Sequence, residues 1–132
     1  MNEKLLNFYK GTEVNTDGNS IEFMLEALYK EFEESHNYVQ WLFPLPEASM
    51  YNPSGPLLDN ETLEVMKNND ECMVNLARAY GYFINFLTYD TQWVTKNNHN
   101  FKRITRAIRC FVLFNRKTFA KNIYCTAVGA LV

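Results

Sequence analysis

Residues 69–87 read NDECMVNLARAYGYFINFL and carry the clearest helical pattern in the chain. Asp70 and Glu71 place negative charge in the first turn, where the helix dipole favours it. Apolar residues then recur at spacings of three and four, as in a helix with one face in a core. They are Met73, Leu76, Ala77, Tyr80, Phe83, Ile84 and Leu87. Gly81 interrupts this stripe, and we expect another helix to approach closely there.

Similar patterns flank this segment on both sides. They predict helices over 19–35, 59–67, 100–115 and 117–131, with shorter ones at 3–9 and 36–43. Asn19 and Glu22 have the spacing of a capping box, and Asn100 is suited to cap the helix that follows it. No segment alternates with the period of a strand. We therefore predict an all-α fold: a single compact bundle of about five to six helices with one long Pro-rich loop at 44–58.

Length and composition are typical of one small globular domain. The chain has 132 residues, of which 47% are hydrophobic and 15% aromatic, so disorder is not expected. Its apolar runs are far shorter than the ~20 residues that span a bilayer, and no signal peptide follows Met1. We therefore expect one intracellular domain over residues 1–132 that does not interact with membranes.

Residues suited to catalysis or metal binding are sparse. His36 and His99 lie far apart, and neither is at zinc-ligand spacing from a cysteine. Cys72, Cys110 and Cys125 are expected to be small buried residues in a reducing compartment. No phosphate-binding glycine motif is present. We expect no enzyme activity, no metal and no cofactor, although a Cys–His pair assembled by the fold stays open.

Charge is divided unevenly along the chain. Residues 1–90 have a net charge of −10 and residues 91–132 a net charge of +8, because all 15 acids precede residue 91. The basic residues of the C-terminal third are Lys102, Arg103, Arg106, Arg109, Arg116, Lys117 and Lys121, with Lys96 before them. We expect those of the helix over 100–115 to lie off its apolar stripe. They would either contact a nucleic acid or another anion, or form ion pairs with acids such as those of 19–35.

Aromatic residues gather beside the Pro-rich loop. They are Tyr38, Trp41, Phe43 and Tyr51. One interpretation is a core cluster that anchors the loop. The other is an aromatic-lined groove for a peptide.

Two motifs carry a family resemblance. Residues 36–47 read HNYVQWLFPLPE and residues 99–106 read HNFKRITR. These runs resemble the H-x-Y-[IV]-Q-W-L-F-P-L and H-N-x-x-R-I-T-R elements of the opioid growth factor receptor family. Phe8-Tyr9, Asn52-Pro53 and Pro56-Leu57-Leu58 fit the same family in the same order. The resemblance runs from about residue 5 to the C-terminus and implies an all-helical domain.

The resemblance also implies a binding module. The animal receptor is described as an intracellular, nuclear-associated receptor for the peptide Met-enkephalin. We therefore expect a peptide or protein partner, in the cytoplasm or, in a eukaryote, in the nucleus. The resemblance brings no catalytic or ligand residues with it.

The two motifs suggest site residues of their own. If they form a binding groove, its floor comprises Tyr38, Gln40, Trp41, Arg103 and Arg106. If they are structural, the defining residues are His36, Pro44, His99 and Asn100. In that case we expect the first motif to pack against the helix of the second, with Arg103 or Arg106 holding loop carbonyls or Glu47.

Overall fold

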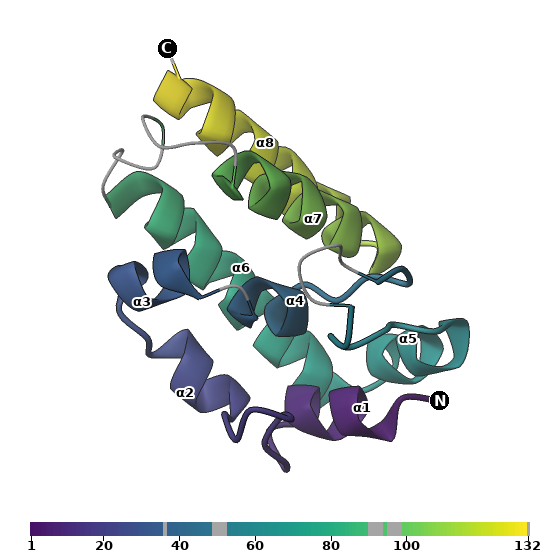
Figure 1. Cartoon of the computed structure of the whole chain (residues 1–132). Coiled ribbons are helices and arrows are strands. Elements are labelled where there is room, and N and C mark those ends of the chain that lie inside the picture. Colours follow the sequence, from purple (N-terminus) through teal and green to yellow (C-terminus); the bar gives the residue numbers. More distant parts are fainter. Residues whose placement is uncertain (36, 49–52, 90–93, 95–98, 132) are drawn as a thin grey trace. The chain divides into compact units, whose positions relative to one another are not determined.

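The computed structural model describes residues 1–35, 37–48, 53–89, 94 and 99–131 (Figure 1). Within them lie eight helices and no strand, which confirms the all-α class. The helices are α1 (Glu3–Lys10), α2 (Ile21–Leu25), α3 (Tyr29–Glu34), α4 (Tyr38–Leu42), α5 (Asn60–Lys67), α6 (Asp70–Tyr89), α7 (His99–Leu113) and α8 (Lys117–Leu131). The expected number of five to six is therefore too low for the described residues.

The chain divides into two compact units, Met1–Ala79 and Tyr80–Val132. The boundary falls inside α6, whose first half belongs to the first unit and whose second half belongs to the second. The expectation that residues 1–132 form one domain stays a prediction. Among the described residues, no helix is long and apolar enough to cross a membrane.

Local capping chemistry fixes the ends of α1 and α5. The Asn2 side chain accepts a hydrogen bond from the Leu5 amide, and Gly11 ends α1 in the left-handed conformation at φ +82°. Asp59 caps α5 by accepting from the Thr62 amide at 2.7 Å. The Asn2 amide also donates to Thr62 Oγ1 at 2.7 Å, which joins the starts of these two helices.

The helix predicted over 19–35 is in fact two helices, α2 and α3. Of the predicted capping pair Asn19-Ser20, Ser20 is the N-cap of α2, because its hydroxyl accepts from the Phe23 amide, and the capping box of Asn19 and Glu22 is not formed in the described structure. Leu28 is extended at the start of α3, at φ −64° and ψ 148°, and lies 68% exposed. In a continuous helix, Leu28 and Phe32 would lie on the same face, because they are four residues apart. The break separates them, so Leu28 is exposed while Phe32 is fully buried.

The buried face of α6 is rotated from the predicted stripe. Leu76, Phe83 and Leu87 are buried as expected, but Ala77 is exposed. Further buried residues of this helix are Cys72, Asn75, Ala79 and Phe86. A Cβ at Gly81 would meet nothing within 4 Å, so the close approach predicted there is wrong for the described structure.

In the second unit, α7 packs along α8 (green and yellow in Figure 1). A turn at Asn115, whose φ is +59°, connects them. An aromatic cluster joins both to the middle of α6: the Tyr80 and Phe119 rings stack at 4.1 Å, and Phe111 meets each of them edge-on. Asn122 Nδ2 donates to the Tyr80 hydroxyl at 2.9 Å, which satisfies the polar end of that ring.

Candidate functional site

The first motif forms α4 and the start of the following loop. Its residues from Val39 to Leu45 are buried. Trp41 is 3% exposed, and its ring lies 5.0 Å from that of Phe8. Trp41 is therefore a core residue and does not line an open groove in this structure. Tyr38 is half-buried, Pro44 is buried, and His36 and Tyr51 lie outside the described residues.

A chain of hydrogen bonds holds α4 in the first unit. The Tyr9 hydroxyl donates to the Leu42 carbonyl at 2.6 Å, and Asn75 Nδ2 donates to the Tyr9 carbonyl at 2.7 Å. Arg78 donates to Asn75 Oδ1 at 3.1 Å and forms a two-pronged ion pair with Glu22. These bonds run through α4, α1, α6 and α2, so they tie the first motif to three other helices.

The ion pair at the end of this chain shifts both of its pKa values. The Arg78 guanidinium holds the pKa of Glu22 below its ordinary value, and Glu22 raises the pKa of Arg78. Hydrogen bonding between the two side chains is the largest cause in each case. The pair therefore stays ionised at neutral pH.

Gln40 is the exception in this well-bonded region. Its side chain is 4% exposed, and the buried Oε1 atom has no hydrogen-bond partner among the described residues. A buried acceptor without a donor costs about 1–3 kcal/mol and calls for an explanation. Two residues away, burial and the charge of Glu31 raise the pKa of the half-buried Tyr38. Both residues belong to the predicted groove floor, and a ligand role for them stays a prediction.

The second motif opens α7, which begins at His99. Asn100 lies inside the first turn and is 2% exposed, so the prediction that it caps the helix is wrong. Its Oδ1 atom accepts from Arg103 Nη1 at 3.0 Å. This bond lies within the motif, and it supports a structural role for Asn100. The His99 side chain lies outside the described residues.

Arg103, Arg106 and Arg109 form a basic ridge along α7. This ridge does not lie wholly off the apolar face of the helix. Arg103 is 6% exposed, Arg106 is half-buried, and Arg109 is exposed. Each step of three residues turns the side chain back by about 60° around the helix, so the ridge runs from the core into solvent. The prediction for Arg103 is thus wrong, because the buried face is centred on Ala107 and extends to Cys110.

The five residues predicted for a groove floor are divided between the two units. Tyr38, Gln40 and Trp41 belong to the first unit, and Arg103 and Arg106 belong to the second. Their union in one groove stays a prediction. The packing of the first motif on the second, and the contact between an arginine and Glu47, stay predictions as well.

The cysteines differ in accessibility. Cys72 and Cys110 are buried, as predicted, but Cys125 is exposed. Burial raises the pKa of Cys72 to about 11 and raises that of Cys110 further. A thiol with a raised pKa is a poor nucleophile at neutral pH. In the part of the chain that the structure describes, no three His, Cys, Asp or Glu side chains are grouped to hold a metal ion.

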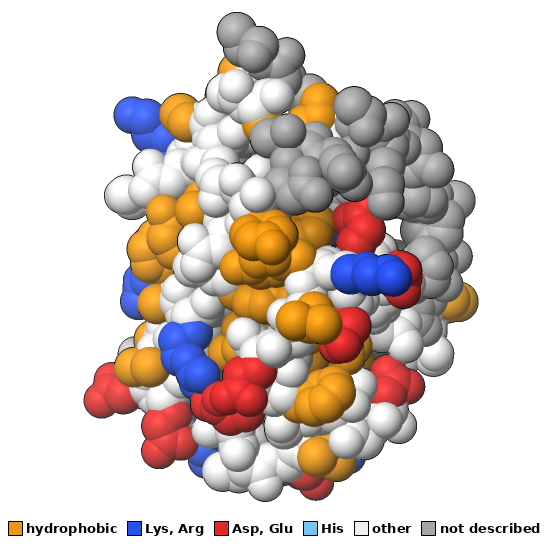
Figure 2. All heavy atoms as spheres, turned by 90° about the vertical axis from the view of Figure 1, so that its left-hand side faces the viewer, with side chains coloured by type: hydrophobic (Ala, Val, Ile, Leu, Met, Phe, Trp, Pro, Cys, Tyr) orange, Lys and Arg blue, Asp and Glu red, His pale blue; other side chains and the backbone are white. Residues whose placement is uncertain are grey.

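Exposed residues of other types were harder to predict. In Figure 2, hydrophobic side chains are interspersed with acidic and basic ones on one face of the molecule. Phe23 of α2 is 52% exposed, and Tyr124 of α8 is 60% exposed. Tyr124 was missed as a candidate, although it follows the exposed Lys117 and Lys121 at spacings of seven and three. That spacing places all three on one helix face and was visible in the sequence.

Comparison with known proteins points to one family. The model of the opioid growth factor receptor conserved region matches residues 1–94. The human opioid growth factor receptor is 40% identical over 58 residues, which cover 44% of this chain and 8% of the receptor. Opioid growth factor receptor-like protein 1 from Xenopus tropicalis is 27% identical over 113 residues, covering 70% of this chain and 22% of that protein. The mouse receptor-like protein 1 is 28% identical over 125 residues, which cover 79% of this chain and 27% of that protein. No solved structure matches.

Proposed function

This chain belongs to the family of the opioid growth factor receptor conserved region, and we propose on that premise that it is a non-enzymatic module that binds a peptide or protein partner. The chain spans 8% of the human receptor and about a quarter of the receptor-like proteins. A binding activity like that of the whole relatives is therefore a proposal for this chain. The name of the human relative describes a receptor, which supports a binding role. We place that role inside the cell.

The observation that carries this proposal is the unpartnered Oε1 atom of Gln40. Every residue of a peptide other than proline has a backbone N–H that can donate to such an acceptor. A ligand that supplies this donor would recover the free energy that the free protein loses by burying Oε1 alone. Tyr38, which is half-buried on the same short helix, would supply a second polar contact through its hydroxyl.

Access to Gln40 requires a local change at α4, because Oε1 is buried. The helix has five residues. The side chain of its N-cap Asn37 makes no cap bond, and Ser35 Oγ accepts from the Asn37 and Tyr38 amides at 3.2 Å. Helices this short have little stability of their own. We propose that α4 opens locally at Asn37 and Tyr38 to admit a ligand, which breaks the two bonds to Ser35. Tyr9 keeps the C-terminal end of α4 in place through the Leu42 carbonyl.

The first prediction tests this role with Gln40→Leu. Peptides selected from a displayed random library on the wild-type chain, and Met-enkephalin as a defined probe, are titrated by calorimetry. We expect Gln40→Leu to weaken binding at least about tenfold, which corresponds to the loss of one buried hydrogen bond. The same variant should unfold at an equal or higher urea concentration, because it removes a buried acceptor that has no donor.

A matched control is Asn85→Leu, which makes the same change from amide to leucine at an exposed position of α6. It should leave binding unchanged. An unchanged dissociation constant for Gln40→Leu would overturn the assigned site. Failure of both the library and Met-enkephalin to yield a ligand would count against peptide binding itself.

A further inference from the structure

The second unit has a strong excess of positive charge. Residues 80–132 contain eight basic residues and one acid, Asp90, which gives a net charge of +7. Repulsion among so many cations has a cost that an anionic ligand would relieve. Lys117 and Lys121 lie on α8, are exposed, and have no ion pair among the described residues.

These two lysines begin a row along one side of α8. Lys117, Lys121, Tyr124 and Val128 follow one another at spacings of four, three and four, so they share one face within about 60° of arc. The Tyr124 side chain is 60% exposed, and that of Val128 is 41% exposed. The buried residues of α8 include Ala120, Ile123 and Ala127, which lie about a quarter-turn around the helix from this face.

We propose that this face of α8 binds single-stranded nucleic acid. The lysine ammonium groups would contact successive phosphates, since they lie one helical turn apart, at a rise of about 6 Å. Tyr124 lies about one further turn along and would stack its ring on an unpaired base. Val128 would extend the apolar surface beneath that base. The positive charge of the two lysines is complementary to a phosphate backbone. An acidic protein segment could also pair with the lysines, but it would have no base to stack on the Tyr124 ring.

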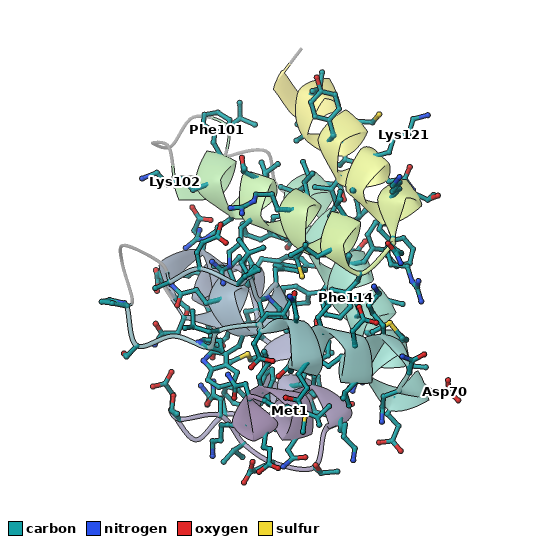
Figure 3. All side chains as sticks on the ribbon, turned by 90° about the vertical axis from the view of Figure 1, so that its right-hand side faces the viewer. Met1, Asp70, Phe101, Lys102, Phe114 and Lys121 are labelled. Atoms are coloured by element: carbon teal, nitrogen blue, oxygen red, sulfur yellow. The ribbon has the colours of Figure 1, made fainter. Side chains whose placement is uncertain are left out.

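The exposed ring is the reason for preferring a single strand to a duplex. In a duplex the faces of the bases are stacked on one another, so an aromatic side chain reaches them only after unstacking. Single-strand binding proteins combine a basic track with aromatic side chains in this way. Figure 3 shows the labelled Lys121 pointing away from the ribbon of α8, with Lys102 and Phe101 at the start of α7.

The proposal relies on two of the seven basic residues singled out in the sequence. Arg103 is buried and donates to Asn100, and Arg116 donates to the Phe114 carbonyl at 3.4 Å. Lys102, Arg106 and Arg109 are not required, because each has other interactions within the protein. The face on α8 is also independent of Gln40, so the proposal does not rest on peptide binding.

The test is fluorescence anisotropy with a labelled 20-nucleotide oligo(dT), measured at 50 and 200 mM NaCl. A 20-base-pair duplex and phosphatidylserine vesicles serve as alternative probes. We expect Tyr124→Ala to weaken oligo(dT) binding about tenfold, since stacking on one base contributes ~1–3 kcal/mol. Its salt dependence should match that of wild type. Lys117→Ala/Lys121→Ala should instead lower the slope of log K against log salt by about 1.4, at ~0.7 per phosphate.

Two controls isolate the α8 face. Tyr89→Ala removes another exposed tyrosine of the second unit, and Lys4→Ala/Lys30→Ala removes two lysines of the first. Neither should change oligo(dT) binding, and Gln40→Leu should not change it either. Circular dichroism shows whether each variant is folded.

Three results would overturn the proposal. One is the absence of oligo(dT) binding by the wild type at 50 mM NaCl. Another is binding that neither α8 variant changes. The third is tighter binding to the duplex or to the vesicles, without an effect of Tyr124→Ala, which would point to phosphate contact alone or to an anionic membrane.

Discussion

At the scale of single residues, two glycines of this chain differ in whether their position needs a glycine. Gly11 ends α1 at φ +82°, in a conformation that side chains with a Cβ rarely adopt. Gly81 lies inside α6, with open space where a Cβ would stand. The first glycine is therefore needed for its backbone conformation, and the second only weakens the helix.

This contrast gives the third prediction. Gly11→Ala should destabilise the fold by about 1–2 kcal/mol, the cost of left-handed backbone for an L-residue. Gly81→Ala should stabilise it by up to about 1 kcal/mol, because alanine has the higher helix propensity. Urea unfolding followed by circular dichroism measures both. Equal midpoints for the two variants would contradict the assignment of Gly11 as an obligatory left-handed cap.

Gln40 and Arg103 show how burial changes the meaning of a polar residue. Arg103 has a neighbour, Asn100, one turn away that accepts its hydrogen bond, so its burial is compensated locally. The Oε1 atom of Gln40 has no such donor among the residues that the structure describes. Burying a polar atom without a hydrogen-bond partner costs free energy that the fold does not recover. Such an atom points to function more strongly than a buried polar group that has a partner.

At the scale of elements, the Arg78–Glu22 pair connects the short α2 to the long α6. The two helices are far apart in sequence, and α2 has only five residues. Its Ser20 cap and this ion pair therefore replace the stability that a longer helix would have of its own. Removing the ionised carboxylate should loosen α2 first.

The fourth prediction concerns the pH dependence of this link. The pKa of Glu22 is lower in the folded chain than its ordinary value of 4.5, because Arg78 donates to the ionised carboxylate. The stabilising contribution is therefore complete above the ordinary pKa and is lost as pH falls through the folded value. The urea midpoint should fall between pH 6 and pH 3 by more in the wild type than in Glu22→Gln.

The exposed Glu13 provides the control for that comparison. Glu13→Gln removes a carboxylate that has no ion pair among the described residues. Its midpoint should fall with pH as that of the wild type does. If Glu22→Gln also kept the full wild-type decrease, the ion pair would have no role in acid stability.

At the scale of the whole molecule, one helix belongs to both units. The boundary between Ala79 and Tyr80 cuts α6 near its middle. Residues 1–79 carry a net charge of −9 and residues 80–132 one of +7, so the units differ sharply in charge but share a backbone element. Helix formation is cooperative, and unfolding half of α6 exposes the hydrogen-bonding groups of the other half.

The fifth prediction follows from this shared helix. Two-dimensional NMR spectra recorded across a urea series should show amides of α1 and α8 losing intensity at the same midpoint. A change that destabilises the first unit, such as Gly11→Ala, should lower both midpoints together. Two separate midpoints would mean that α6 breaks at the boundary and that the units fold independently.

Much of the fold could be predicted from local chemistry. The capping residues Asn2 and Asp59, the left-handed Gly11 and the pattern over 117–131 set the ends of α1, α5 and α8. These signals act between residues a few positions apart, so they are present in the sequence itself. The two motifs that indicated the family are also continuous runs, and the match over residues 1–94 confirms that family.

The sequence by itself thus determined the helical class, most helix ends, the family and the separation of charge along the chain. The tertiary structure alone decided that 19–35 breaks before Leu28, that Arg103 and the unpartnered Gln40 are buried, and that Tyr124 stays exposed. The physical reason is that hydrophobic periodicity gives each helix an apolar arc with wide edges. Where burial stops within that arc depends on side chains from distant segments, as Phe8 covers Trp41 and Phe119 covers Tyr80.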